Sequence, residues 1–310
     1  MNRICEQDLE SYRLAAYARQ VACYICDGAN TFDAELCRHC FAPMALSQQA
    51  KGQKFLPHIA AVLGASGVGK TVYLGMLMDI LSRRPGPLQI SARGPFSITL
   101  QQTTVAALQG CEFPSKTPNE PDQWNWIHCR VQAKGVKPGT ELMLPDVAGE
   151  AIEQEIEHPQ TFPVIRSVLG KCSGIVLLLD SIQLRDGNHA QEHYAMKVLS
   201  LLSELNGDRK TGWPTRPVSI VFSKADQTDV CLDDPDAFAR EHIPGVFSDC
   251  QERFPKTRYF AAGVAGACAF RTEIDRTRRR IPLRVEPRGI IEPFSWIVQS
   301  LPKARKAEST

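Results

Sequence analysis

The sequence predicts an α/β fold, in which a mostly parallel sheet has helices on both faces and is joined to a small N-terminal metal-binding module. Three observations support this prediction. Apolar runs of strand length alternate with helical runs between residues 55 and 302, which is typical of a parallel sheet covered on both faces. Polar motifs follow several of these apolar runs, at the strand ends where such sheets bind ligands. Two C-x2-C pairs lie close together near the N-terminus.

The composition indicates the general class of protein. The chain has 310 residues, 43% of them hydrophobic, and a formal net charge of +2. This length suits one large domain and one small one, and the near-neutral charge gives no indication of a polyanionic partner. No apolar run approaches the roughly 20 residues of a membrane helix, and the N-terminus lacks the apolar core of a signal peptide. We therefore expect a cytoplasmic protein with no membrane segment and with reduced cysteines.

The N-terminal part carries the metal-ligand pattern. Residues 1–20 are expected to contain a short helix, and residues 21–46 contain the two cysteine pairs, separated by ten residues. Two residues between cysteines let both thiolates of one turn reach the same ion, and four thiolates suit tetrahedral Zn²⁺. The pattern predicts a zinc ribbon, with iron or no metal as alternatives. The predicted ligands are Cys23, Cys26, Cys37 and Cys40.

The polar residues 47–54 predict a linker, and the main domain begins at about residue 55. The zinc ribbon itself is expected to act as a docking module or as a lid. At the other end of the chain, residues 303–310 form a basic tail that is expected to be frayed.

The strongest motif follows the apolar run at residues 58–63. Residues 64–71 have the spacing G-x-x-x-x-G-K-[ST] of a phosphate-binding loop, with a strand before it and an amphipathic helix after it. Glycines let the backbone N–H groups approach phosphate oxygens. Lys70 would bridge the terminal phosphates, and the Thr71 hydroxyl would bind Mg²⁺. The predicted nucleotide-binding residues of this loop are Gly64, Ser66, Gly67, Val68, Gly69, Lys70 and Thr71.

The rest of the domain alternates helices and strands. The predicted helices span residues 71–81, 97–108, 152–169, 190–205, 237–254 and 290–301. The predicted strands span residues 58–63, 127–131, 141–144, 175–179, 218–222 and 258–261.

A second motif, Asp146-x-x-Gly149, follows the strand at residues 141–144. On its own D-x-x-G is a common turn. Placed after the phosphate loop, its carboxylate can hold Mg²⁺ through water and its glycine N–H can reach a γ-phosphate. Glu150 is then the candidate for positioning the attacking water. Thr117, in a proline-rich loop, is the candidate switch threonine and the third predicted catalytic residue beside Lys70 and Glu150.

A third motif concerns the base. Ser223-Lys224-Ala225-Asp226 resembles the [NT]-K-x-D motif of GTPases, whose carboxylate accepts two hydrogen bonds from guanine while the lysine stem covers the ring. Adenine lacks these donors and would leave the carboxylate unpaired. The alternative is a helix-capping Asp beside a solvated Lys. A weaker signal is Ala261-Ala262, where GTPases place a backbone N–H against the guanine oxygen.

The order of these motifs over residues 55–302 resembles the Ras-like, translation-factor-related (TRAFAC) class of P-loop GTPases. With the N-terminal zinc ribbon and the pattern at residues 286–297, the chain is similar to the bacterial double-GTPase proteins. That family has been proposed, from gene context, to act as paired GTPases in conflict or defence systems. The resemblance implies GTP/GDP, Mg²⁺ and Zn²⁺ as cofactors, and a second GTPase as protein partner.

Three residues depart from that class. Ser223 replaces Asn or Thr, which alters the hydrogen bonds between this motif and the phosphate loop. Glu150 replaces a water-orienting Gln, and its charge near a γ-phosphate predicts slow hydrolysis. Ser66 replaces a glycine and would hinder an arginine inserted by an activator. The expected function is a Mg-dependent GTP-binding molecular switch that hydrolyses GTP slowly without an activator.

Two other functions stay open. The first is a P-loop ATPase or kinase acting on a small molecule, and the second is a hydrolysis-deficient, GTP-bound scaffold whose zinc ribbon binds a protein or nucleic acid. Nucleic-acid binding is only weakly supported. The arginines that could contact a nucleic acid are at positions 276, 278–280, 284 and 288, and no aromatic residues interleave with them. A solvated loop or a partner contact is the favoured interpretation of that stretch.

Overall fold

The computed structural model describes residues 20–53, 55–83, 86–133, 139–206, 214–272 and 276–302. The helix expected within residues 1–20 and the tail at 303–310 lie outside the described residues, apart from residue 20. Across the described ranges, no helix has the length and apolar character needed to cross a membrane.

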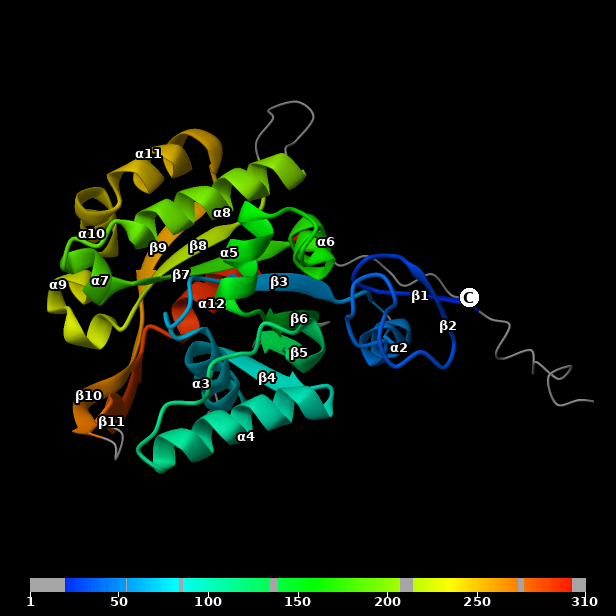
Figure 1. Cartoon of the computed structure of the whole chain (residues 1–310), viewed down its shortest axis with the longest axis horizontal. Coiled ribbons are helices and arrows are strands. Elements are labelled where there is room, and N and C mark those ends of the chain that lie inside the picture. The colour runs from blue at the N-terminus through cyan, green and yellow to red at the C-terminus, as the bar shows by residue number, and fades with distance from the viewer. Residues whose placement is uncertain are drawn as a thin grey trace, which may run out of the picture.

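A seven-stranded sheet forms the centre of the main domain, in the order β4-β5-β6-β3-β7-β8-β9 (Figure 1). Strands β6, β3, β7, β8 and β9 are parallel, and β4 and β5 join antiparallel at one edge. The strands are β3 (His58–Leu63), β4 (Leu88–Ala92), β5 (Asn125–Ala133), β6 (Thr140–Asp146), β7 (Gly174–Asp180), β8 (Val218–Ser223) and β9 (Thr257–Ala261). Every residue of the inner strands β3, β7 and β8 is buried, as a sheet covered on both faces requires.

Helices lie on both faces of this sheet, with α3 and α4 on one side and α8 and α11 on the other (Figure 1). The predicted α/β fold with a mostly parallel sheet is therefore confirmed. The helices are α3 (Lys70–Arg83), α4 (Pro95–Gln109), α5 (Gly149–Glu157), α6 (Pro163–Lys171), α7 (Ser181–Arg185), α8 (Ala190–Asn206), α9 (Asp229–Asp233), α10 (Pro235–His242), α11 (Pro244–Arg253) and α12 (Ile291–Ser300). Two short 3-10 turns are η2 (Pro121–Gln123) and η3 (Ala225–Gln227).

Two helices that the sequence predicted as continuous are each divided by a proline. The predicted helix at 152–169 breaks before Pro163, where the buried Glu155 carboxylate accepts hydrogen bonds from the N–H groups of Gln160 (2.9 Å) and Phe162 (2.6 Å). The predicted helix at 237–254 breaks before Pro244. Proline lacks the N–H that a helix interior needs but suits a first turn, so both breaks follow from the sequence.

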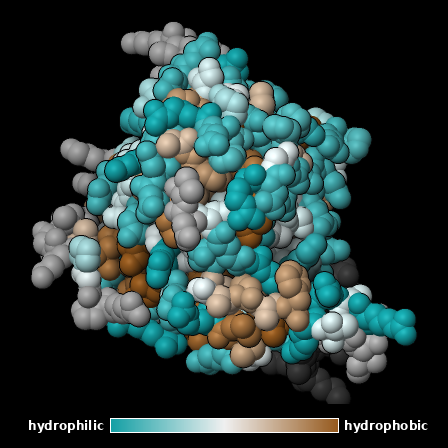
Figure 2. All heavy atoms as spheres, turned by 90° about the vertical axis from the view of Figure 1, so that its left-hand side faces the viewer, coloured by the Kyte–Doolittle hydropathy of each residue, from teal (hydrophilic) through white to brown (hydrophobic). Residues whose placement is uncertain are grey.

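A β-hairpin replaces the loop that the sequence predicted for the arginine-rich stretch. Strands β10 (Gly263–Thr272) and β11 (Arg278–Arg288) pair antiparallel directly after β9. Three register shifts between Gly263 and Cys268 bend the hairpin near its base. Figure 2 shows the side of the molecule on which the hairpin lies, mostly hydrophilic with scattered hydrophobic side chains. Phe270 (68% exposed) and Leu283 (59%) are the most exposed large hydrophobic residues of the hairpin.

The N-terminal module consists of β1 (Gln20–Ala22), β2 (Ala29–Thr31) and α2 (Ala45–Lys51). Most of the predicted linker at 47–54 is therefore helical, and Ser47 is buried because its hydroxyl accepts a hydrogen bond from the Tyr24 N–H (2.8 Å). The Tyr24 hydroxyl donates to Pro57 O, and Lys171 Nζ donates to Tyr24 O (3.0 Å). These contacts attach the module to the main domain just before β3 begins at His58.

This attachment point is the amino end of β3, whereas the predicted phosphate loop follows its carboxyl end. The module therefore lies at the opposite end of the sheet from the polar motifs (Figure 1). The expectation that it acts as a lid over bound nucleotide is wrong.

Candidate functional site

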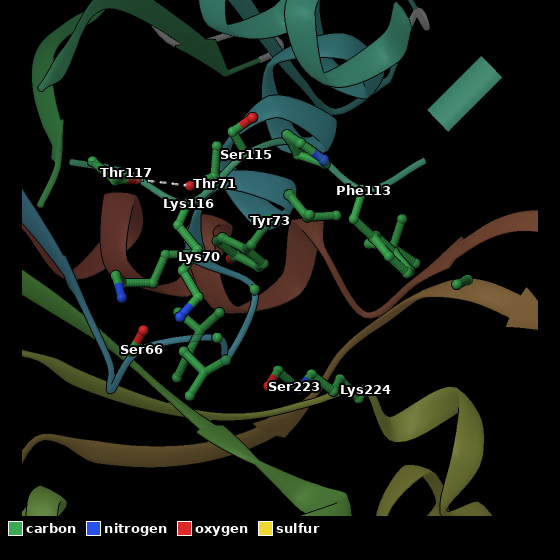
Figure 3. Close-up of a pocket in the computed structure, with 18 of the residues that line it drawn as sticks. Ser66, Lys70, Thr71, Tyr73, Phe113, Ser115, Lys116, Thr117, Ser223 and Lys224 are labelled. Atoms are coloured by element: carbon green, nitrogen blue, oxygen red, sulfur yellow. Dashed lines mark hydrogen bonds between the residues drawn. The ribbon is translucent and has the colours of Figure 1, made fainter. Parts of the chain in front are cut away.

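A cavity of about 560 Å³ lies at the carboxyl ends of the parallel strands, and parts of all three predicted motifs line it (Figure 3). The loop after β3 contributes residues 66–71, and the segment before η2 contributes residues 113–120. Ala148 and Glu150 line it from the second motif, and Ser223, Lys224 and Asp226 line it from the third. Of the other predicted nucleotide-binding residues, Gly64 and Gly149 are not among the described residues that line the cavity.

The loop after β3 has the backbone that its glycines predict. Gly67 and Gly69 have φ angles of +76° and +97°, a region that residues with side chains seldom adopt. Gly64 is needed because a Cβ there would lie 2.7 Å from Leu178 O of the neighbouring strand β7. Val68 is buried and lines the cavity. Residues 66–71 form one wall of the cavity, the place where a phosphate-binding loop would meet its ligand.

Lys70 crosses this loop from the first turn of α3. Its side chain is buried, and Nζ donates hydrogen bonds to Gly64 O (2.8 Å) and Ala65 O (3.1 Å). Burial lowers the pKa of Lys70 to about 8, and the nearby Asp146 carboxylate is the largest opposing influence on that pKa. The ammonium group is thus held at the loop by carbonyl oxygens alone, which an anionic ligand could replace.

Three oxygen atoms from separate elements meet beside Lys70. Thr71 Oγ1, Thr117 Oγ1 and Asp146 Oδ2 are each 3.0 Å from the other two, and Figure 3 shows the two threonines facing each other. Within the described residues, the buried Asp146 Oδ1 has no hydrogen-bond partner. Burial raises the pKa of Asp146, and Lys70 and the two threonines oppose this. Neighbouring oxygen ligands of octahedral Mg²⁺ lie about 2.9 Å apart, so this donor set fits Mg²⁺.

Glu150 connects the phosphate loop to the segment that carries Thr117. Its Oε1 accepts a hydrogen bond from Ser66 Oγ (2.9 Å) and lies 3.6 Å from Lys116 Nζ. The Ser66 hydrogen bond and the Lys116 charge lower the pKa of Glu150, so the carboxylate is ionised at neutral pH. Gly149 packs directly on the loop, because a Cβ there would lie 2.5 Å from Ser66 N. The start of α5 and the phosphate loop are therefore in contact.

At the other end of the cavity, the third motif is held by the sheet. Ser223 Oγ donates to Leu179 O (3.1 Å) rather than to the phosphate loop. Lys224 has a φ of +58°, and its Nζ donates to the carboxylate of Asp180. Asp226 lines the cavity, and burial is the main cause that raises its pKa.

Of the two alanines that the sequence predicted beside the base, only Ala262 lines the cavity. The N–H of Ala262 donates to Phe222 O (2.8 Å), although this residue does line the cavity. Ala261 is buried in β9 and is not among the described residues that line the cavity. Ala262 therefore contributes to the wall of the cavity with its N–H already bonded within the sheet.

Several residues of the site carry no sequence motif. Tyr194 of α8 accepts a hydrogen bond from the Gly64 N–H at its hydroxyl (3.2 Å), and so connects α8 to the phosphate loop. Phe113 and Tyr73 line the cavity (Figure 3). Cys268 and Arg280 reach it from the hairpin. Only the apolar periodicity of the predicted helices at 190–205 and 71–81 could have drawn attention to Tyr194 and Tyr73, and Arg280 was noticed only as part of the arginine-rich stretch.

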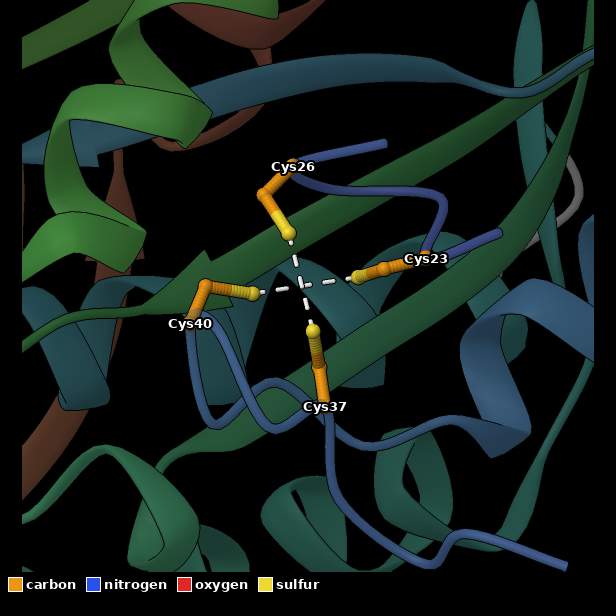
Figure 4. A group of neighbouring side chains, drawn as sticks. All are labelled: Cys23, Cys26, Cys37 and Cys40. Atoms are coloured by element: carbon orange, nitrogen blue, oxygen red, sulfur yellow. Dashed lines mark hydrogen bonds between the residues drawn. The ribbon is translucent and has the colours of Figure 1, made fainter. Parts of the chain in front are cut away.

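The four predicted metal ligands converge on one point in the N-terminal module (Figure 4). The sulfur atoms of Cys23 and Cys40 are 3.7 Å apart, and those of Cys26 and Cys37 are 3.5 Å apart. Tetrahedral Zn²⁺ with 2.3 Å bonds would place its sulfur ligands about 3.8 Å apart. The N–H groups of Ile25, Gly28 and His39 donate to the sulfurs at 3.4 Å. The donor set therefore fits zinc.

Comparison with known proteins gives one match to a family. The model of the family described as Double-GTPase 1 matches residues 61–231. No curated protein matches the chain.

Solved structures of GTPases resemble the chain only distantly. The S. cerevisiae Ski7 GTPase-like domain bound to GTP is 17% identical with a TM-score of 0.40, over 79% of this chain and 50% of that one. A variant of Era from Aquifex aeolicus bound to GDP and AlF4⁻ is 14% identical with a TM-score of 0.40, over 79% of this chain and 57% of that one. The Chaetomium thermophilum complex of SRb-GTP and SRX is 15% identical with a TM-score of 0.36, over 68% of this chain and 91% of that one. These likenesses are too weak to bear on function.

Proposed function

The chain belongs to the Double-GTPase 1 family, and from that premise we propose that it binds GTP and GDP with Mg²⁺ and hydrolyses GTP slowly as a molecular switch. One observation carries the proposal. A single cavity borders the phosphate loop, the oxygen cluster of Thr71 and Thr117, and the carboxylate of Asp226. A nucleoside triphosphate needs these three kinds of contact at the same time, for its phosphates, its metal ion and its base.

Each of these residues then has a defined role. Lys70 Nζ exchanges its bonds to Gly64 O and Ala65 O for bonds to phosphate oxygens. Thr71, Thr117 and Asp146 would hold Mg²⁺, which would neutralise phosphate charge. Gly149 offers its N–H to the γ-phosphate, and Glu150 positions the attacking water.

Slow hydrolysis follows from the surroundings of Glu150. Its carboxylate is ionised and Ser66 and Lys116 both engage Oε1, so turning the group toward an attacking water molecule would cost these two contacts. A negative charge beside the γ-phosphate also opposes the charge that develops there. The same observation favours a second candidate, a scaffold that binds GTP without turnover. Phosphate release in a single turnover distinguishes the two, because the scaffold releases none.

Switching would depend on two segments that contact the phosphate loop. Residues 113–120 reach it through Thr117, and α5 reaches it through Gly149. Loss of the γ-phosphate removes a ligand common to both segments, so their conformations would change together. We propose that this change is read by a protein partner, and that the partner is a second GTPase of a bacterial conflict or defence system. The four-cysteine module, which we propose binds Zn²⁺, would serve as a docking module.

Asp226→Asn tests the base assignment. We expect the variant to lose affinity for GTP by roughly tenfold to hundredfold, because a charge-assisted hydrogen bond pair is lost, and to gain affinity for xanthosine triphosphate. Dissociation constants for GTP, ATP and xanthosine triphosphate with Mg²⁺ measure this. If ATP binds as well as GTP and the substitution changes neither, the protein is instead a P-loop ATPase or a kinase acting on a small molecule.

Nucleotide affinity should also depend on pH through Lys70. Its pKa in the free protein is about 8, and bound phosphates favour the charged ammonium, so binding takes up a proton above that pH. We expect the dissociation constant for GDP to be flat below about pH 8 and to rise by up to tenfold per pH unit above it. Titrations from pH 7 to pH 9.5 would show this. Lys70→Arg, which stays charged, should lose the dependence; an equal slope in this variant would assign the effect to another group.

A further inference from the structure

Guanine has two kinds of hydrogen-bonding edge, and a selective site has to satisfy both. Its N1–H and N2–H₂ groups are donors, and its O6 and N7 atoms are acceptors. The ionised carboxylate of Asp226 can only accept, so it can serve only the donor edge. Some other group in the base end of the cavity has to donate to O6 and N7.

Most side-chain donors at that end are already engaged. Ser223 Oγ donates to Leu179 O at 3.1 Å, and Lys224 Nζ donates to the Asp180 carboxylate. Gln227 Nε2 lies 3.4 Å from Asp226 Oδ2 and 3.5 Å from Cys268 Sγ. Of the two residues that the sequence predicted to offer an N–H to guanine O6, Ala262 lines the cavity, and its N–H is bonded to Phe222 O.

Arg280 differs from these donors and from the other arginines of the hairpin. Arg271 pairs with Glu112, and Arg284 pairs with Glu286, both at 3.0 Å. Arg278 and Arg279 are exposed, whereas Arg280 is half-buried and lines the cavity. The backbone of Arg280 pairs with that of Phe270 in the hairpin, but within the described part of the chain its side chain makes no hydrogen bond and no ion pair. Its guanidinium therefore has five N–H donors for a ligand.

The bend of the hairpin accounts for this position. Register shifts between Gly263 and Cys268 turn β10 so that it runs alongside η3, where Cys268 Sγ meets Gln227. Arg280 lies opposite Phe270 on the neighbouring strand, two residues beyond Cys268. Burial raises the pKa of Asp226, and the positive charge of Arg280 lowers it by a smaller amount. The two side chains therefore lie within electrostatic reach of each other.

We propose that Arg280 is a second base-binding residue, which donates hydrogen bonds to O6 and N7 of guanine while Asp226 accepts from N1–H and N2–H₂. This inference rests on the proposed function, because it requires a guanine nucleotide in the cavity. A guanidinium matches the two adjacent acceptors of guanine in a bidentate arrangement. The hairpin would then supply a part of base selection that the Ser223-Lys224-Ala225-Asp226 motif lacks.

Binding of GDP, 7-deaza-GDP and IDP tests the proposal, with Mg²⁺ and at fixed salt. The first analogue lacks the N7 acceptor, and the second lacks the N2 donors. We expect Arg280→Ala to weaken GDP binding roughly tenfold or more. We expect the wild type to bind GDP more tightly than 7-deaza-GDP and the variant to bind the two alike. The preference for GDP over IDP, which Asp226 provides, should persist in the variant. Arg279→Ala is the matched control, because Arg279 is exposed and does not line the cavity.

Two outcomes would overturn the proposal while leaving GTP binding intact. One is an Arg280→Ala variant that binds GDP as tightly as Arg279→Ala. The other is a wild type that does not distinguish GDP from 7-deaza-GDP, a result that needs no variant to fold. A wild type that does not bind GDP at all would instead overturn the proposed function.

Discussion

Replacing Cys37 by serine is expected to unfold the four-cysteine module and to lower the melting temperature of the whole chain. Cys37 is fully buried, and its sulfur lies with three others around one point (Figure 4). Zinc provides about 10–16 kcal/mol of apparent binding free energy in zinc-finger peptides, and such binding drives folding. The module is small, so we expect it to depend on this contribution.

The effect should extend beyond the module because its apolar residues are part of the main core. Ile25, Met44 and Leu46 belong to the same buried cluster as the residues of β3 and β7. The buried His128 of β5 also forms a hydrogen bond with Gln49 of α2 (2.9 Å). Unfolding of the module would expose the apolar surface beneath it and leave His128 without this partner.

Metal content, thermal melting and limited proteolysis measure this prediction. Cys37→Ser should contain little zinc, melt at a lower temperature and be cut within residues 20–51. A chelator should have the same effect on the wild type, and added Zn²⁺ should reverse it. Cys111→Ser is the control, because Cys111 is exposed and lies outside the cluster. A Cys37→Ser protein with one zinc ion per chain and an unchanged melting temperature would contradict the prediction.

Gly149→Ala is expected to reduce GTP hydrolysis by roughly 100-fold or more while leaving GDP binding nearly intact. A Cβ at position 149 would lie 2.5 Å from both Ala65 C and Ser66 N, which are backbone atoms that cannot simply rotate away. The start of α5 would have to move off the phosphate loop, taking the Gly149 N–H and Glu150 with it. A displacement of about 1 Å at reacting groups can cost on the order of 100-fold in rate.

Gly170→Ala is the matched control for this substitution. Gly170 lies in α6, and a Cβ there would meet no atom within 4 Å, so alanine should be neutral or slightly stabilising. Single-turnover phosphate release and GDP titration of both variants would test the prediction. Equal hydrolysis rates in the two variants would show that contact between α5 and the phosphate loop is not needed for turnover.

The order of strands and helices could be predicted because its signals are local. The run at 58–63, the glycines after it and the amphipathic residues of α3 follow one another in the sequence, and each pattern has one main interpretation. Thr117 was singled out only by its place in a proline-rich loop, yet it lies 3.0 Å from Thr71 and Asp146. Its proposed role in sensing the γ-phosphate remains a prediction.

What the sequence missed depends on contacts between distant segments. The edge strand β4 was overlooked because only Leu88 and Ile90 of its residues are buried, and its pairing with β5 is needed to define it. The hairpin was interpreted as a loop because arginines at many positions hide the alternation of apolar and polar residues that is typical of a strand. Tyr194 and Arg280 reach the site from α8 and β11, which approach the phosphate loop and Asp226 only in the folded chain. No spacing rule connects these residues to a motif.

The attachment of the four-cysteine module at Pro57 has a consequence for assembly. Strand β3, which separates this attachment from the phosphate loop, has six residues and so spans roughly 20 Å. A protein bound to the module would therefore leave the nucleotide entrance open to a second protein. If the module serves as the proposed docking site, one partner would determine where the GTPase is recruited while another, bound at the far end of β3, would control its turnover. Recruitment and activation could then change independently, without competition for a common surface.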